Sequence, residues 1–148
     1  FKDSIRGPKQ TQSFDQLIDI STHPDESIRY YSGTLVYYKQ ISIDQLPTGN
    51  IYLNLHDIGV TAKVTVNGQY AGGVWTPPYR LDISEWLHRG ENQISVEVTT
   101  TWQNRLIGDS RLPEQERTTW TACNGWSEKD PLQKSGLIGP VTLEVVKR

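Results

Sequence analysis

An Asn-Gly pair between two alternating segments is the feature that most restricts how this chain can fold. Asn67-Gly68 is the preferred dipeptide of a two-residue β-hairpin turn, because both central residues of that turn need φ above zero. Before it, Val64 and Val66 alternate with polar residues, which is the period-2 pattern of a half-buried strand. After it, Gly72-Gly73 and Pro77-Pro78 predict that the regular ladder gives way to a shaped loop.

The same alternation recurs along the chain in short segments rich in β-branched and aromatic residues. These segments cover residues 34–41, 51–55, 60–66, 93–101 and 141–145, and the hairpin adds at least one more strand. Residues 84–90 read as one or two helical turns, with Ser84 suited to the N-cap and Gly90 to the residue after the C-cap. So many short strands predict an all-β fold, an antiparallel β-sandwich or barrel.

The 148 residues are expected to form a single domain, residues 1–148. Residues 1–32 are poorly patterned, but residues 1–27 carry enough apolar side chains that we expect them to dock against the sandwich. The chain contains no methionine, so we expect that it was cut from something longer.

Charge and cysteine content exclude several classes of partner. The net charge is −2 and the basic residues are scattered, so neither nucleic acid nor an anionic membrane is an expected partner. No apolar run approaches the roughly 18 residues needed to span a bilayer. Cys123 is the only cysteine, which excludes an internal disulfide but does not settle the compartment. We expect it to be a small, half-buried residue and not a nucleophile.

The residues themselves contain no convincing catalytic or metal-binding pattern. Hydrolysis by paired carboxylates needs two acids placed in one cleft, and the 17 acidic residues include no pair that the sequence can place so. The three histidines lie far apart and are expected at surface or capping positions. No Asp/Asn cluster specifies a calcium site. We therefore expect no catalytic residue, no metal and no cofactor.

Aromatic residues in two loops predict a recognition surface instead. The chain has five Trp and seven Tyr against two Phe, and Trp and Tyr suit half-buried positions or stacking on ligands. One loop covers residues 75–80. The other covers residues 102–136, which is too long for an idle connection in a compact domain.

Sugars are bound by aromatic faces together with a few well-placed polar groups, and these loops offer both. The candidate residues are Trp75, Tyr79, Arg80, Trp102, Asn104, Arg105 and Asp109. An alternative reading makes the tryptophans plugs in the core or in a domain interface. We expect loop 75–80 to lie beside residues 104–109, so that the two form one surface.

Four motifs, in order, give the chain a family resemblance. They are Tyr31-Ser32-Gly33-Thr34, Trp75-Thr76-Pro77-Pro78-Tyr79-Arg80, Asn104-Arg105-Leu106-Ile107-Gly108-Asp109 and Ser135-Gly136-Leu137-Ile138-Gly139-Pro140-Val141. The four motifs resemble the C-terminal domain of family 106 α-L-rhamnosidase-like enzymes of Bacteroidetes, and this closer resemblance spans about Ile28 to Val145. Val66-Asn67-Gly68, the glycine pair, Asp82-Ile83 and Gly90-Glu91-Asn92 resemble the galactose-binding-like jelly-roll domain of glycoside hydrolase family 2 enzymes.

This resemblance implies a jelly-roll β-sandwich excised from a bacterial glycoside hydrolase. The catalytic acids of such enzymes lie in a (β/α)₈ barrel that this chain does not contain. The implied function is that of a non-catalytic accessory domain, which packs on the barrel and contributes contacts to a plant or host glycan. The resemblance also implies a periplasmic or extracellular location, and a structural calcium ion is common in such sandwiches.

Asp130 is the last candidate, and it rests on the resemblance alone. It lies six residues before Gly136, where family 2 enzymes carry an aspartate that holds a sugar hydroxyl in the active site. Here Pro131 follows it, which departs from the family pattern. Two other functions stay open for the domain. One is an autonomous carbohydrate-binding module, and the other is a purely structural interface domain without a ligand.

Overall fold

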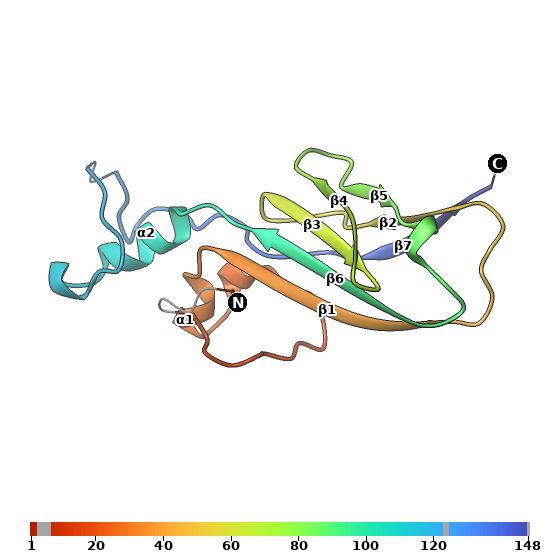
Figure 1. The fold of residues 1–148 in the computed structure, drawn as a ribbon. Helices are drawn as coiled ribbons and strands as arrows, with labels where there is room; N and C mark the ends of the chain where they lie inside the picture. The colour runs from red at the N-terminus through yellow and green to blue at the C-terminus, as the bar shows by residue number, and fades with distance from the viewer. Residues whose placement is uncertain (3–6, 123–124, 148) are drawn as a thin grey trace.

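The computed structural model describes residues 1–2, 7–122 and 125–147, which form two antiparallel sheets packed face to face (Figure 1). The larger sheet has the order β1-β6-β3-β4 and comprises β1 (Thr34–Ile43), β6 (Gly90–Thr99), β3 (Thr61–Val66) and β4 (Gln69–Val74). The smaller sheet has the order β5-β2-β7 and comprises β5 (Arg80–Asp82), β2 (Asn50–Asn54) and β7 (Thr142–Val146). The predicted all-β, antiparallel sandwich is confirmed.

Helical structure is confined to short segments outside the sheets. The α-helices are α1 (Glu26–Arg29) and α2 (Gln103–Ser110), and the 3₁₀ turns are η1 (Ile20–Thr22), η2 (Ser84–Trp86) and η3 (Glu114–Glu116). Within the described ranges, no helix has the length and apolarity that crossing a membrane requires.

The core lies between the two sheets and follows the alternation read from the sequence. Val64 and Val66 of β3 are fully buried. The inward-facing residues of β6, which are Ile94, Val96 and Val98, expose at most a few per cent of their surface. From the smaller sheet, Ile51 and Leu53 pack into the same cluster. Burial of each such side chain contributes about 1.5–3 kcal/mol, so this cluster is the main source of stability.

A second, smaller cluster attaches the N-terminal segment to one end of the sandwich. Its buried members are Ile20, Ile28, Tyr31 and Leu35, with Phe1, Phe14 and Ile18 packed around them. The backbone N–H of Ile20 also donates to the carbonyl of Ser135 at 3.0 Å. This segment therefore joins the first strand to the residues that lead into the last one.

The hairpin has the predicted turn, but its second strand is longer than predicted. Asn67 and Gly68 have φ of 51° and 80°, as the two-residue turn requires. The expectation that Gly72-Gly73 leaves the ladder is wrong, because Gly72 pairs with Val64 and Gly73 with Lys63. A glycine keeps its backbone N–H, so a register shift near Ala71 suffices to keep the strand paired.

The predicted helical turn at residues 84–90 is shorter than expected. The 3₁₀ turn ends at Trp86, its N-cap position is Ile83, and Gly90 is already the first residue of β6. Ser84 is therefore not the N-cap of this turn. Its Oγ accepts a hydrogen bond from the backbone N–H of Ile51 at 2.7 Å. The expectation for Cys123 falls outside the described residues.

Candidate functional site

The stretch after β6 forms an extension that projects beyond one end of the sandwich (Figure 1). It begins with α2, continues through η3 and returns toward the sheets, where Leu137 bridges to Ile58. The sequence predicted a long functional segment here but no helix. The extension and the β4–β5 connection are the two places where the candidate residues lie.

The polar candidate residues on α2 are buried and make contacts with other residues of the same chain. The Asn104 amide donates to the carbonyl of Gln133 and accepts the N–H of Gln133, both at 2.8 Å, so it holds the returning segment against α2. Arg105 is also buried, and its backbone N–H donates to the Ser32 hydroxyl at 3.1 Å. In this conformation, the Asn104 side chain holds the returning segment to α2, and the Arg105 backbone joins α2 to the residues before β1.

Asp109 is the anchor of the segment that follows α2. Its Oδ2 accepts four hydrogen bonds of 2.8–3.0 Å, from the backbone N–H groups and the hydroxyls of Thr118 and Thr119. Burial raises the pKa of this carboxyl, but the bonds from the two threonines outweigh burial and the pKa is lowered. Asp109 is therefore ionised at neutral pH. Its Oδ1 lies 3.9 Å from Arg105 and has no hydrogen-bond partner among the described residues.

The candidates on the β4–β5 connection divide into one exposed residue and two packed ones. Trp75 is 71% exposed. Tyr79 packs on the main core, and the Arg80 guanidinium lies 3.9 Å from the centroid of the Tyr52 ring. Arg80 Nε also pairs with Glu144 at 3.2 Å. Of these candidates, Trp75 has the most exposed side chain, whereas Tyr79 and Arg80 are half-buried.

The expected single surface made by loop 75–80 and residues 104–109 does not form. Figure 1 shows the β4–β5 connection on the body of the sandwich and α2 well beyond its end. The sequence could not reveal this separation, because the length of β6 and the direction of the chain after it decide where α2 lies.

Asp130 lies further along the extension and closes a turn of its own. Its Oδ2 accepts the backbone N–H of Ser127 at 2.6 Å and the Ser127 hydroxyl at 2.9 Å. The side chain is thus positioned by local bonds, and it remains partly exposed.

Three tryptophans on the extension are the exposed aromatic groups of this region. Trp102 is 63% exposed, Trp120 86% and Trp126 40%. Trp120 and Trp126 line a depression of about 630 Å³, together with Leu106, Asp109, Ser110, Glu114, Arg117, Thr118, Thr119, Thr121 and Ala122. Neither Trp120 nor Trp126 was chosen from the sequence, and their proximity to Asp109 depends on the way Thr118 and Thr119 fold back onto it.

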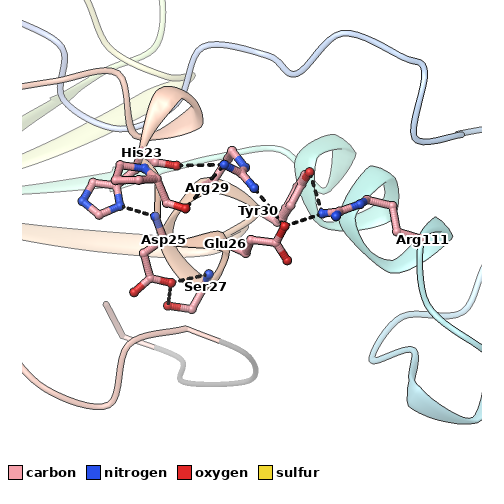
Figure 2. A network of polar contacts seen from close by, with 8 residues as sticks. His23, Asp25, Glu26, Ser27, Arg29, Tyr30 and Arg111 are labelled. Atoms are coloured by element: carbon pink, nitrogen blue, oxygen red, sulfur yellow. Dashed lines mark hydrogen bonds and ion pairs between the residues drawn. The ribbon is translucent and has the colours of Figure 1, made fainter.

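A polar network joins the extension to the N-terminal segment. Figure 2 shows Arg111, just after α2, pointing toward Glu26 and Tyr30 of the α1 region. Its Nη1 donates to Glu26 Oε1 at 2.7 Å and to the Tyr30 hydroxyl at 2.9 Å. Next to it, Gly108 lies so close to Tyr30 that an added Cβ would come 2.7 Å from the ring carbon Cγ. This contact fixes where α2 lies against the sandwich.

Replacing Arg111 with Met is expected to lower the melting temperature by roughly 1–3 °C, because the pair with Glu26 lies at the surface. The hydrogen bond from Arg111 lowers the pKa of Glu26. The pair therefore stabilises the folded state at pH values above 4.5, which is the ordinary pKa of this carboxyl. Its contribution is lost as the pH falls through the pKa that Glu26 has in the folded state. Thermal melts at pH 7 and pH 3 measure this, with Arg89→Met as the control for charge. An equal Arg111→Met effect at both pH values contradicts the assignment.

The described residues give no location for a metal ion. Within the ranges that the structure describes, no group of three His, Cys, Asp or Glu side chains could hold one. The calcium ion that the resemblance implied therefore has no site assigned to it.

Comparison with known proteins connects this fold and its extension to glycoside hydrolases. Residues 19–134 match the family model described as the glycosyl hydrolase 2 galactose-binding domain-like. A protein of Formosa agariphila named "Putative beta-glucuronidase" is 37% identical over 159 residues, which cover 90% of this chain and 14% of that protein. The structure of a rhamnosidase from Novosphingobium sp. PP1Y has a TM-score of 0.78 and 37% identity, and the match covers 86% of this chain and 12% of that one.

A more distant structure shares the fold. A glycosyl hydrolase family 2 member from Bacteroides cellulosilyticus has a TM-score of 0.53 and 21% identity, over 79% of this chain and 13% of that one. This chain spans only about an eighth of the length of the relatives it matches. The family model covers most of the chain, and the resemblance read from the four motifs is confirmed. The chain belongs to the glycosyl hydrolase 2 galactose-binding domain-like family.

Proposed function

We propose that this chain is a non-catalytic accessory domain of a glycoside hydrolase, which packs on the catalytic barrel and contributes carbohydrate contacts through the extension. The observation that carries the proposal is the depression beside α2, where Trp120 and Trp126 lie next to threonine hydroxyls. Tryptophan faces and placed polar groups are the combination that suits sugar rings. The similarity to a rhamnosidase and to a protein named as a beta-glucuronidase supports a glycan as the ligand.

The proposal includes the setting of the protein. A domain that helps to degrade a plant or host polysaccharide works where such polymers are present, so we place it in the periplasm or outside the cell. Trp102 and Trp75 are also exposed, and we assign them to the contact with the catalytic domain or with the glycan.

Calorimetric titration of the chain with rhamnosides and galactosides tests the proposal. We expect saturable binding, and we expect Trp120→Ala to weaken it roughly two- to tenfold, because one aromatic stacking contact is lost. Trp120 is so exposed that this change leaves the fold intact. Leu46→Ala, a change at an exposed apolar residue in the β1–β2 turn, is the control and should bind as the unmodified chain does.

Each other outcome points to one of the alternatives. No binding of any glycoside indicates a structural interface domain without a ligand. Binding that is unaffected in Trp120→Ala indicates a carbohydrate-binding module with its site elsewhere. In the whole enzyme, we expect Trp120→Ala to raise KM with kcat unchanged, because the residue binds the substrate without taking part in the reaction.

A further inference from the structure

The outer face of the four-stranded sheet carries an ordered set of aromatic and hydroxyl side chains. In β1, residues that alternate with the buried Leu35 point away from the core, and Tyr38 is one of them. The register places Tyr38 opposite Ser95 of β6, Ser95 opposite Thr65 of β3, and Thr65 opposite Tyr70 of β4. These four residues therefore form one row that crosses all four strands, with a tyrosine at each end.

The two tyrosines are open to solvent, and the residues between them are small. Tyr38 is 67% exposed and Tyr70 is 64% exposed. Neighbouring strands lie about 4.8 Å apart, so three strand spacings separate the tyrosines by roughly 14 Å. Because serine and threonine are small and the tyrosine rings are large, the surface is lower in the middle of the row than at its two ends. Such a distance is spanned by several linked sugar rings and not by a single ring.

The absence of a side chain at Gly73 leaves room for the Tyr70 ring. A Cβ on Gly73 would come 3.3 Å from the Tyr70 hydroxyl oxygen, which is closer than most side chains tolerate. The ring thus extends along β4 over the glycine, and its outer face stays uncovered. Glycine weakens a strand interior and often marks a place where another molecule approaches closely. Here it accommodates a ring that a larger residue would push aside.

The chemistry of this face distinguishes a glycan from a protein partner. Within the row and in the next row, where Gln40 pairs with Gln93, the groups other than the tyrosines are hydroxyls and amides, whereas the row on the other side carries Val36, Glu97 and Lys63. Glu97 pairs with Lys2 at 2.8 Å and lies opposite Lys63 in the register, so its charge is balanced. The core of a protein interface is more apolar than this. Amides and hydroxyls both donate and accept, as sugar hydroxyls require.

We propose that this row, Tyr38-Ser95-Thr65-Tyr70, binds an extended neutral polysaccharide across the strands. The site is separate from the depression beside α2, and it would hold the polymer to the domain instead of presenting one sugar to a catalytic centre. Each tyrosine stacks on one ring of the chain, and the intervening hydroxyls and amides bond to the rings between them.

Native gel electrophoresis of the chain in gels that contain a soluble polysaccharide tests this proposal. The probes are galactan, xyloglucan and rhamnan as neutral polymers and polygalacturonate as the anionic one. We expect at least one neutral polymer to retard the chain. Tyr38→Ala and Tyr70→Ala should each weaken that binding about fivefold, and the double variant should migrate as in a gel without polymer. Both side chains are so exposed that neither change endangers the fold.

Three results overturn the proposal. They are no retardation by any neutral polymer, retardation that persists in the double variant, and a change of oligomeric state in the tyrosine variants, which would make the face a contact between copies. Trp120→Ala separates this site from the depression. It should weaken the binding of small glycosides, whereas the double tyrosine variant should leave that binding unchanged, so either site can fail without the other.

Discussion

Replacing Asn92 with Ala is expected to lower the free energy of unfolding by about 3 kcal/mol, which for a domain of this size corresponds to roughly 10 °C in melting temperature. The Asn92 side chain is 1% exposed and all its hydrogen-bonding capacity is used. Its Oδ1 accepts from the Asn67 amide and the His88 N–H, and its Nδ2 donates to the carbonyls of His88 and Gly90. Truncation removes these four hydrogen bonds at once, although the Asn67 amide keeps its bond to the Trp86 carbonyl.

Asn92→Asp tests whether the bonds matter more than the volume. The aspartate has the same shape, but it places an oxygen where the amide faces two carbonyls, so we expect a similar loss. Gln93→Ala, on the exposed side of the same strand, is the control and should change stability by less than about 0.5 kcal/mol. Chemical denaturation measures all three. A cost below about 1 kcal/mol for Asn92→Ala would show that the network does not hold the hairpin to the turn before β6.

Replacing Gly136 with Ala is expected to cost about 3 kcal/mol, for two reasons. Gly136 has φ of 91°, where a side chain strains the backbone. A Cβ there would also come 2.5 Å from the Tyr37 hydroxyl oxygen, which accepts the Leu137 N–H at 3.0 Å. Strand β1 and the segment that leads into β7 meet at this point. The clash between the new Cβ and the Tyr37 hydroxyl must therefore push them apart.

A double-mutant cycle with Tyr37→Phe isolates the steric part of this cost. Removing the hydroxyl makes room for the new Cβ, so we expect Gly136→Ala to cost about 1 kcal/mol less in the Phe background. Gly125→Ala, whose added Cβ meets nothing within 4 Å, is the control. Equal costs of Gly136→Ala in both backgrounds would contradict the packing described between Tyr37 and Gly136.

These two residues show what the family motifs encode. Gly90-Glu91-Asn92 and Ser135-Gly136 carried the resemblance, and their structural roles are a buried network and a tight approach of two segments. The sandwich could be predicted because alternation and the Asn67-Gly68 turn are local signals. Gly72-Gly73 stays in the ladder, against expectation, because glycine keeps the backbone donor that proline lacks.

The site could be predicted less well than the fold. The sequence does not distinguish a polar residue that binds a ligand from one that bonds to its own chain. Asn104, Arg105 and Asp109 have the right chemistry for sugars, yet Gln133 and Thr118 occupy the side chains of Asn104 and Asp109, and Arg105 is buried beside Asp109. α2 was not predicted because Gly108 is a poor helix residue, and packing against Tyr30 holds it in place. The exposure of Trp120 likewise arises from tertiary structure.

We propose that the extension after α2 is the part of the domain that meets the glycan. The most direct measurement is a two-dimensional ¹H–¹⁵N spectrum, in which the five tryptophans each give one indole N–H signal, recorded while methyl α-L-rhamnoside or methyl β-D-galactoside is added. We predict saturable shifts for Trp120 and Trp126, and an unshifted Trp86. Shifts confined to Trp75, or no shift of any indole signal at millimolar glycoside, would contradict the account.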